Sequence, residues 1–307
     1  MELCFRGTRG SIPKPITEKT IGEKVNKAIQ LVRNNQAYDP EQLPFHLRGT
    51  YGGNTACVEV RQQDEYMIFD AGTGLREFGN QVMADADKSG KVFNIFLSHP
   101  HWDHIQGFPF FLPAYMPGNI INIYGFHRNL DRIFDQQQSS PFFPVSLSVM
   151  QAVINFKQLE IGKEYDIAGC RISGIKQNHP GDSYGYALEK EGKKIIYSTD
   201  NEHWDIRQER EFIEFCKNAD LLIMDAQYSF ADANFQKENW GHSSNIIVTE
   251  LAVAAEAKKL CLFHHDPNCS DKDLDRILQE TRDYLTYFDS ESDLEITMAY
   301  DGLVLKI

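Results

Sequence analysis

The segment FLSHPHWDHIQGF, residues 96–108, constrains this chain more than any other feature of its sequence. Within six positions, directly after a short apolar run, it carries His99, His101, Asp103 and His104. Side chains alternate along an extended strand end, so the first two histidines point the same way, and the Asp–His pair follows where a turn begins. Imidazole nitrogens and carboxylate oxygens at this density are typical of ligands for zinc, iron or manganese. A histidine-rich surface turn explains the H-x-H-x-D-H spacing poorly.

A site for two metal ions needs further ligands, and three later apolar runs each end in a suitable residue. His179 follows a predicted strand in IKQNHP, and Asp200 follows another in IIYSTDN, where a carboxylate can bridge two ions. A third run, LCLFHHDP, ends with His264 and His265. Functional residues commonly lie on loops at strand ends. Each of these residues alone is better explained as a turn or a cap, but the strand ends together favour one metal site.

Short apolar runs ended by turns recur along all 307 residues and predict a strand-rich fold. The expected strands cover 56–61, 66–72, 92–99, 119–125, 170–176, 184–190, 193–200, 220–226, 258–265, 294–300 and 303–307. The expected helices cover 17–35, 206–217, 243–257 and 270–288. Hairpin-rich strands with single helices between them favour two facing sheets with helices outside. We predict one domain, 1–307, with a helical insertion at about 14–46 and an irregular, lid-like insertion at about 127–156.

Charge and cysteine content exclude several classes of protein. The formal net charge of -13 disfavours binding to long nucleic acid through its phosphates. The six cysteines are scattered without a C-x-x-C pair, which indicates reduced thiols rather than a disulfide framework. The N-terminus has no apolar core of a secretory signal, and no apolar run is long enough to span a bilayer. We therefore expect a cytoplasmic protein with no membrane partner.

Taken together, these motifs resemble the metallo-β-lactamase superfamily of hydrolases, and within it the RNase Z-like and cyclic-nucleotide phosphodiesterase-like branch. The likeness runs from GTRGSIPKP and YGGNTACVEVR through LSHPHWDHIQGFPFF and NHPGDSYGYAL to YSTD, WGHSS and LFHHDP. It spans nearly the whole chain, and the dense histidine motif is highly specific for the superfamily. The resemblance implies an α/β fold, a four-layer αββα sandwich that holds its metals at one edge.

The resemblance also implies two divalent metal ions per chain, zinc or manganese, with iron as a further option. The implied ligands are His99, His101, Asp103, His104, His179, Asp200 and His264. The first two histidines and His179 would hold one ion, His264 would belong to the other with the Asp–His pair, and Asp200 would bridge. His264 is preferred to His265 because the family places its ligand histidine two residues before Ser or Asp, here Asp266.

A general acid is the remaining requirement, since the departing oxygen of a phosphodiester needs a proton that metals do not supply. The branch uses a histidine that matches His242 in WGHSSN, usually paired with a glutamate where this chain has Asp225. The shorter aspartate is a departure from the family pattern and changes the distance to the histidine. The alternative is that His242 is only a neighbour of a helix cap at Ser243. The implied catalytic residues are Asp103, Asp225 and His242.

Substrate size is indicated by what separates His179 from Asp200. True RNase Z enzymes insert a long basic arm there, but in this chain the two residues are 21 positions apart and joined by a simple hairpin. A small phosphodiester, most of all a cyclic nucleotide, therefore fits better than tRNA. The alternatives are a lactonase or thioesterase on the same scaffold, a tRNA 3′-processing endonuclease, and a metal-binding sensor without activity. The oligomeric state stays open, with a homodimer among the options.

Overall fold

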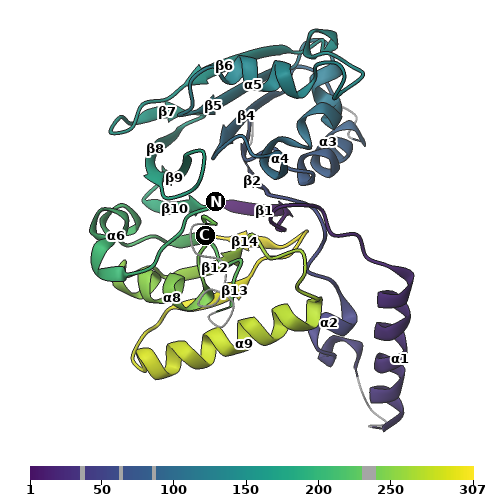
Figure 1. Ribbon diagram of the computed structural model, residues 1–307, viewed down its shortest axis with the longest axis vertical. Coiled ribbons are helices and arrows are strands. Elements are labelled where there is room, and N and C mark those ends of the chain that lie inside the picture. The colour runs from purple at the N-terminus through teal and green to yellow at the C-terminus, as the bar shows by residue number, and fades with distance from the viewer. Residues whose placement is uncertain (35–38, 62–64, 85–87, 230–239) are drawn as a thin grey trace.

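Two seven-stranded sheets lie face to face in the computed structural model, which describes residues 1–34, 39–61, 65–84, 88–229 and 240–307 (Figure 1). In spatial order, the first sheet comprises β14 (Val304–Lys306), β1 (Glu2–Gly7), β2 (Cys57–Arg61), β3 (Glu65–Phe69), β4 (Val92–Leu97), β5 (Ile120–Gly125) and β6 (Val153–Gln158). The second comprises β13 (Glu295–Met298), β12 (Lys259–Phe263), β11 (Leu221–Asp225), β10 (Lys193–Ser198), β9 (Ser183–Lys190), β8 (Cys170–Gln177) and β7 (Tyr165–Ile167).

Helices cover the outer faces of both sheets. The described α-helices are α1 (Glu18–Asn34), α2 (Phe45–Arg48), α3 (Gly74–Ala84), α4 (Trp102–Ile105), α5 (Leu130–Gln137), α6 (Arg210–Cys216), α8 (Asn245–Ala254) and α9 (Asp271–Phe288). Short 3-10 turns lie at Pro40–Gln42, Phe108–Phe110, Leu112–Tyr115, Leu147–Val149 and Ile206–Gln208. The layers run helix, sheet, sheet, helix, which confirms the predicted αββα fold (Figure 1). Among the described residues, no helix has the length and apolar character to span a membrane.

Three apolar clusters hold these layers together. Between the sheets, Phe69 stacks on Tyr197 with ring centroids 5.1 Å apart. Outside the first sheet, Phe93 packs edge-on against Phe111, at 5.1 Å. Outside the second sheet, α8 buries residues such as Leu251 against the strands. Both sheets are thus covered on both faces, so their inner strands are apolar almost throughout instead of alternating.

The central strands of both sheets are largely parallel, and this arrangement determines where the ends of the strands lie. β3, β4, β5 and β6 run parallel in the first sheet, and β10, β11, β12 and β13 in the second. By contrast, β9 and β10 form a tight hairpin whose turn residues, Glu191 and Gly192, both have positive φ, as a two-residue turn of type I′ requires. Parallel strands bring their carboxyl ends to one edge of a sheet, which is where loops can assemble a site.

The segment 127–156 was predicted to be irregular, and this prediction was wrong in part. Helix α5 lies inside it, and its last residues belong to β6, which pairs in parallel with β5. The helix was missed because it is only eight residues long, although Leu130, Phe134 and Gln137 do repeat on one buried face. Strands β1 and β7 and helix α3 were also absent from the expected elements. The helical insertion expected at about 14–46 contains α1 and α2.

Candidate metal centre

The candidate site lies where strand ends of both sheets meet. β4 leads into His99, β10 into Asp200 and β12 into His264, while β11 ends at Asp225 itself. The backbone takes a left-handed conformation at Asp70, Asp200 and His264, with φ of 60°, 52° and 59°. Non-glycine residues in this conformation cost of order 1 kcal/mol each and cluster at functional sites. At each of these residues the backbone turns sharply at the end of its strand, and the side chain points into the site.

Three histidines form the first group of candidate ligands. His99 Nε2 lies 2.9 Å from His101 Nδ1, and His179 Nε2 lies 3.1 Å from the same His101 nitrogen. Burial lowers the pKa of each of the three, and it holds the pKa of His99 well below its ordinary value. All three rings are therefore neutral at neutral pH, which is the form that binds a metal ion.

Two carboxylates and two histidines form the second group. Asp103 Oδ2 lies 3.2 Å from His104 Nε2 and 3.1 Å from His264 Nε2. Asp200 Oδ1 lies 3.3 Å and 3.1 Å from the same two nitrogens. Burial opposes ionisation of Asp200, but His264 and His104 hold its pKa well below the ordinary value. The pKa of Asp103 is lowered in the same way by His104, against burial.

Asp200 lies between the two groups and presents one oxygen to each. Its Oδ1 faces the second group, while its Oδ2 lies 3.6 Å from His99 Nε2 and 3.7 Å from His179 Nε2. The side chain is almost fully buried, so both oxygens are directed by the protein and not by solvent. This is the geometry that a bridging carboxylate needs.

The outer nitrogens of three histidines donate to protein acceptors. These hydrogen bonds are His104 Nδ1 to Asp70 Oδ2 at 2.8 Å, His179 Nδ1 to the Gly241 carbonyl oxygen at 2.9 Å and His264 Nδ1 to Gln227 Oε1 at 3.1 Å. A hydrogen bond of this kind fixes both the tautomer and the ring orientation of a metal-binding histidine. Each ring consequently turns its Nε2 toward the centre of the site.

The residues of the site fit divalent cations. If His104 and His264 carry their protons on Nδ1, each Nε2 atom is a hydrogen-bond acceptor. Each would then lie 3.1–3.3 Å from carboxylate oxygens, which are also acceptors, and a cation between them would remove the repulsion. His104 Nε2 is buried and has no hydrogen-bond partner. Asp103, Asp200 and Asp70 raise the pKa of His104 well above its ordinary value despite its burial, so the pocket strongly favours positive charge. Within each group the ligand atoms lie within 4.8 Å of one another.

Beside the second group lies a histidine–aspartate pair. His242 Nδ1 lies 2.6 Å from Asp225 Oδ2 and 4.0 Å from Asp200 Oδ2, and its ring stacks on His264 at 5.2 Å. Burial opposes the charged ring, but Asp225, supported by Asp200 and Asp103, raises the pKa of His242 to about 9. The pair is thus in contact with the candidate metal centre and carries a proton at neutral pH.

The structure separates His264 from its neighbour His265. His265 is buried, and its Nε2 donates to the Ala299 carbonyl oxygen at 2.8 Å. Burial, assisted by the positive charge of Arg9, lowers the pKa of His265 to about 3. Its imidazole is therefore a neutral structural donor outside the cluster, whereas His264 contacts both carboxylates of the second group.

Sequence reasoning missed two residues that orient the candidate ligands, Asp70 and Gln227. Asp70 is fully buried and accepts hydrogen bonds from the Ser98 amide at 2.7 Å and from the Tyr197 hydroxyl at 2.7 Å, besides its bond with His104. The sequence did hold a signal for it, because Asp70 directly follows a strand, as Asp200 nearly does.

Comparison with known proteins gives a family and a fold. A family model described as Beta-lactamase superfamily domain matches residues 66–265. Ribonuclease Z of Picrophilus torridus is 25% identical over 323 aligned positions, which cover 89% of this chain and 88% of that protein.

Solved structures resemble the whole chain. The crystal structure of the short form of human tRNase Z gives a TM-score of 0.61 at 21% identity, covering 100% of this chain and 99% of that one. Unliganded yeast PDE1 gives a TM-score of 0.66 at 13% identity, covering 100% and 99%. Identities this low establish the shared fold and leave the substrate open.

Proposed function

Because the chain belongs to the beta-lactamase superfamily, we propose that it is a hydrolase of small phosphodiesters, cyclic nucleotides above all, that works with two divalent metal ions. The two groups of ligand atoms around Asp200 support a dinuclear centre. The relatives named ribonuclease Z support phosphodiester bonds as the type of bond that is cleaved. Zinc and manganese both suit this set of imidazole and carboxylate ligands.

The observation that carries the proposal is the pair of Asp225 and His242. Hydrolysis of a phosphodiester with a poor leaving group needs a proton at the departing oxygen, and a lactone or thioester opened by metals does not depend on a histidine acid. His242 Nδ1 lies 4.0 Å from Asp200 Oδ2 and 2.6 Å from Asp225 Oδ2, and the carboxylate of Asp225 stabilises the positive charge of the imidazole. The substitution of aspartate for the family's usual glutamate therefore still allows a direct hydrogen bond.

Each residue has a stated part in the reaction. When bound, two metal ions supply an activated water and hold the oxygens of the phosphate. Asp225 accepts from His242 Nδ1 and so leaves Nε2–H as the proton that the departing oxygen takes. Once that proton has left, the negative charge of Asp225 favours recovery of a proton from solvent, which prepares the ring for the next turnover. Gln227 holds His264 in place through the 3.1 Å contact with its Nδ1.

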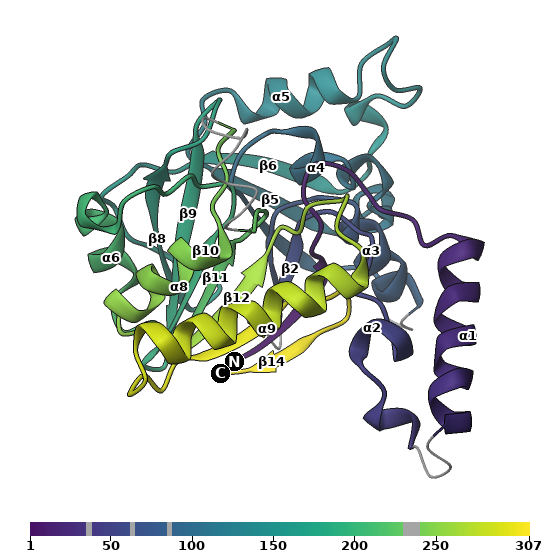
Figure 2. The ribbon, with the colours of Figure 1, turned by 60° about the horizontal axis from the view of Figure 1, so that its bottom comes forward.

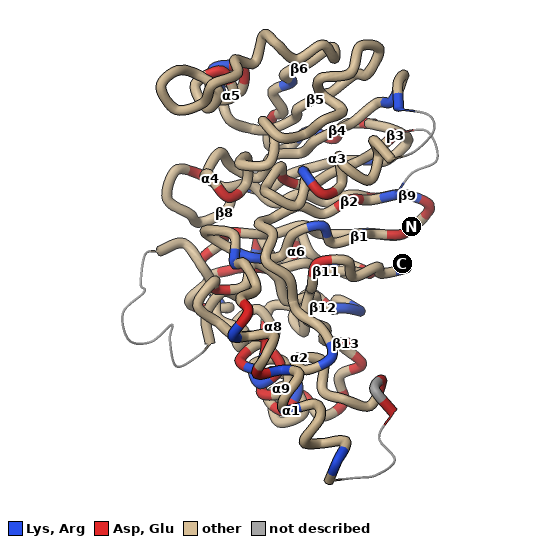
Figure 3. Tube along the Cα trace, turned by 90° about the vertical axis from the view of Figure 1, so that its right-hand side faces the viewer, with Lys and Arg blue, Asp and Glu red and all other residues tan. Residues whose placement is uncertain are grey.

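Three features favour a small nucleotide as the substrate. β9 and β10 are joined by only Glu191 and Gly192, so the place of the basic arm holds a tight turn. Lys and Arg positions are scattered among Asp and Glu positions along the trace (Figure 3). Trp102, the residue between His101 and Asp103, is 60% exposed. Its indole offers an apolar face beside the site on which a nucleobase can stack.

The second candidate function is that of a ribonuclease acting on tRNA precursors. It is favoured by the relatives named ribonuclease Z, which match over most of their length. It is opposed by the short β9–β10 turn and by the net charge of -13, which weakens attraction for a polyanion.

One panel of assays separates the candidates. Purified protein loaded with Mn²⁺ or Zn²⁺ is tested on cyclic nucleotides, bis(p-nitrophenyl) phosphate, a set of lactones and thioesters, and a precursor tRNA. We expect turnover of cyclic nucleotides that falls in the His242→Ala variant. Efficient tRNA cleavage without cyclic-nucleotide turnover would favour the ribonuclease, and lactone turnover that is unaffected by His242→Ala would favour the lactonase.

A further inference from the structure

Helix α1 turns its apolar side to solvent. None of its 17 residues is buried, and the helix projects from the side of the sandwich in both Figure 1 and Figure 2. Between 41% and 50% of the surface is exposed in each of Ile21, Val25, Ile29 and Val32. Their spacing of four, four and three residues places them along one face of the helix. We call these four residues the apolar stripe.

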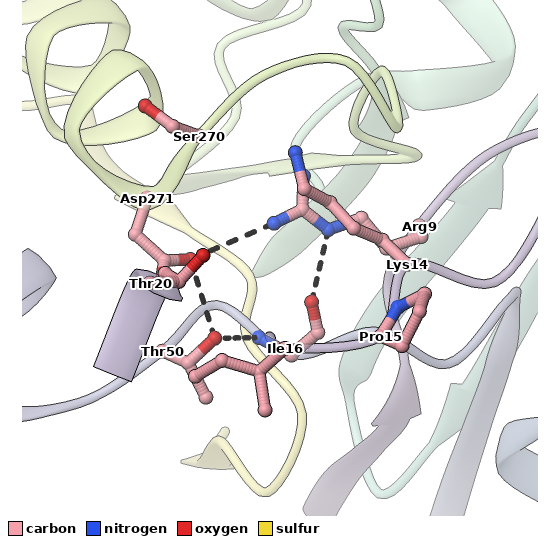
Figure 4. Close-up of a pocket in the computed structure, with 9 residues that line it drawn as sticks. Arg9, Lys14, Pro15, Ile16, Thr20, Thr50, Ser270 and Asp271 are labelled. Carbon is pink, nitrogen blue, oxygen red and sulfur yellow. Dashed lines mark hydrogen bonds and ion pairs between the residues drawn. The ribbon is translucent and has the colours of Figure 1, made fainter. Parts of the chain in front are cut away.

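Lys24 joins α1 to the rest of the chain through polar contacts. Lys24 pairs with Asp271 at the start of α9 and donates to the Gly49 carbonyl oxygen at 2.6 Å. A cleft of about 240 Å³ lies between α1, α2 and α9. A second cleft, of about 130 Å³, lies under the first turn of α1, where the Arg9 guanidinium faces Asp271 (Figure 4). These contacts hold α1 in place, while each side chain of the apolar stripe keeps between 41% and 50% of its surface exposed.

We propose that the apolar stripe is the contact surface for a second copy of this chain, with the two α1 helices packed antiparallel about a two-fold axis. A two-fold interface uses the same surface on both copies, so the surface must complement itself. The stripe does so, because its residues lie nearly symmetrically about the middle of the helix. β-branched side chains at such spacing are typical of helix–helix seams. The proposal is independent of the hydrolase function.

The charges beside the stripe specify the antiparallel direction. Glu18 lies three residues before Ile21, and Arg33 lies four residues after Ile29, so both charges border the stripe at opposite ends. Neither side chain forms an ion pair with the part of the chain that the structure describes. Antiparallel packing brings each Glu18 beside Arg33 of the second copy. Parallel packing would set like charges against each other at both ends.

The size of the surface sets the expected affinity. A helix of 17 residues is about 25 Å long, so a pair of such helices covers roughly 1,000 Å², at the small end of specific interfaces. We therefore expect a reversible dimer with a micromolar dissociation constant. A membrane surface is the rival occupant, but the net charge of -13 opposes approach to anionic lipid.

Sedimentation velocity of the full chain, from about 1 to about 100 µM, tests the proposal across the micromolar range. Val25→Glu places a charge in the middle of the stripe and should weaken self-association at least about 10-fold. Asn26→Glu adds the same charge on another side of α1 and should leave the dissociation constant unchanged. Thermal unfolding verifies that both variants are folded, which we expect because neither residue is buried. A wild-type chain that stays monomeric, or a Val25→Glu chain that dimerises normally, overturns the proposal.

A charge exchange tests the direction of packing. Glu18→Arg and Arg33→Glu should each weaken the dimer, and the double variant should restore it. If the double variant dimerises no better than either single variant, the antiparallel arrangement is wrong.

Flotation with phosphatidylserine–phosphatidylcholine vesicles tests whether the apolar stripe binds a membrane surface instead of a second copy of the chain. Vesicle binding that Val25→Glu abolishes, in a chain that does not self-associate, would assign the stripe to a membrane surface and overturn the dimer.

Discussion

Replacing Asp225 with Asn should make activity depend on pH in a way that reveals the role of His242. In the native pair burial opposes the charge, but the carboxylate 2.6 Å away outweighs it and raises the pKa of His242 to about 9. Asparagine keeps the size and an acceptor oxygen but carries no charge, so the substitution removes the largest of the contributions that raise the pKa of His242. The pKa of His242 should then fall to about its ordinary value of 6.5.

The size of the effect follows from the protonated fraction, since a general acid works only while it holds its proton. At about pH 8, a pKa of about 9 leaves roughly nine-tenths of His242 protonated, whereas a pKa of about 6.5 leaves roughly 3%. The Asp225→Asn variant should therefore lose about 30-fold in kcat at about pH 8. At about pH 6 both forms are mostly protonated, and the loss should be less than about 2-fold.

Steady-state hydrolysis of a cyclic nucleotide at a series of pH values measures this difference. Metal content is determined at each pH, because the candidate ligands titrate as well. Bis(p-nitrophenyl) phosphate serves as the control substrate, since nitrophenolate departs with little need of a proton. On this substrate the rates of the native protein and the Asp225→Asn variant should differ less. A loss of equal size at both pH values, or on both substrates, would refute protonation by His242 and leave Asp225 with a packing role.

Further expectations concern the metals, the acid and the substrate. His242→Ala should retain both metal ions yet lose about 10²–10⁴ in kcat on a cyclic nucleotide, with a smaller loss on bis(p-nitrophenyl) phosphate. Elemental analysis should find about two ions per chain and at least one fewer in Asp200→Ala, and full occupancy in that variant would contradict bridging. Competition with a chelating dye should show zinc affinity falling below about pH 6, because protons compete for the histidines. Trp102→Ala should raise KM for cyclic nucleotides but not for dimethyl phosphate, and equal changes would argue against stacking.

Much of the architecture could be predicted from sequence because the chain uses local patterns consistently. The central strands, such as 92–99 and 193–200, were expected within two residues of β4 and β10, since each is an apolar run closed by a polar residue. The metal-binding pattern is equally local, with His99 and His101 two positions apart. Asp200 follows β10 of the second sheet, whereas the two histidines follow β4 of the first. Bringing them together required both that parallel strands end at one edge of each sheet and that the two sheets face each other, as predicted.

The rest depends on contacts between distant segments. Asp70 orients His104 across 34 positions of the sequence, and Gln227 orients His264 across 37. The local sequence pattern around Asp70 and Gln227 does not indicate which histidine each one contacts. Helix α5 was missed for a related reason, because eight residues give too few turns for a helical period to stand out from a Pro- and Phe-bearing loop. Tertiary packing, and not local propensity, makes that segment a helix.

Backbone conformation gives evidence on three residues of the site that does not depend on any family pattern, although seven other described non-glycine residues also have positive φ. Asp70, Asp200 and His264 adopt positive φ at the ends of their strands, where glycine would relieve the strain. Each has instead a side chain that the proposed centre uses as ligand or orienting group, so local backbone preference is overridden where the chemistry needs it. The same criterion separates two adjacent histidines, because His264 has positive φ and His265 does not. The strained member of the pair is the one that turns its imidazole toward Asp103 and Asp200, which supports His264 as the ligand on grounds the sequence could not supply.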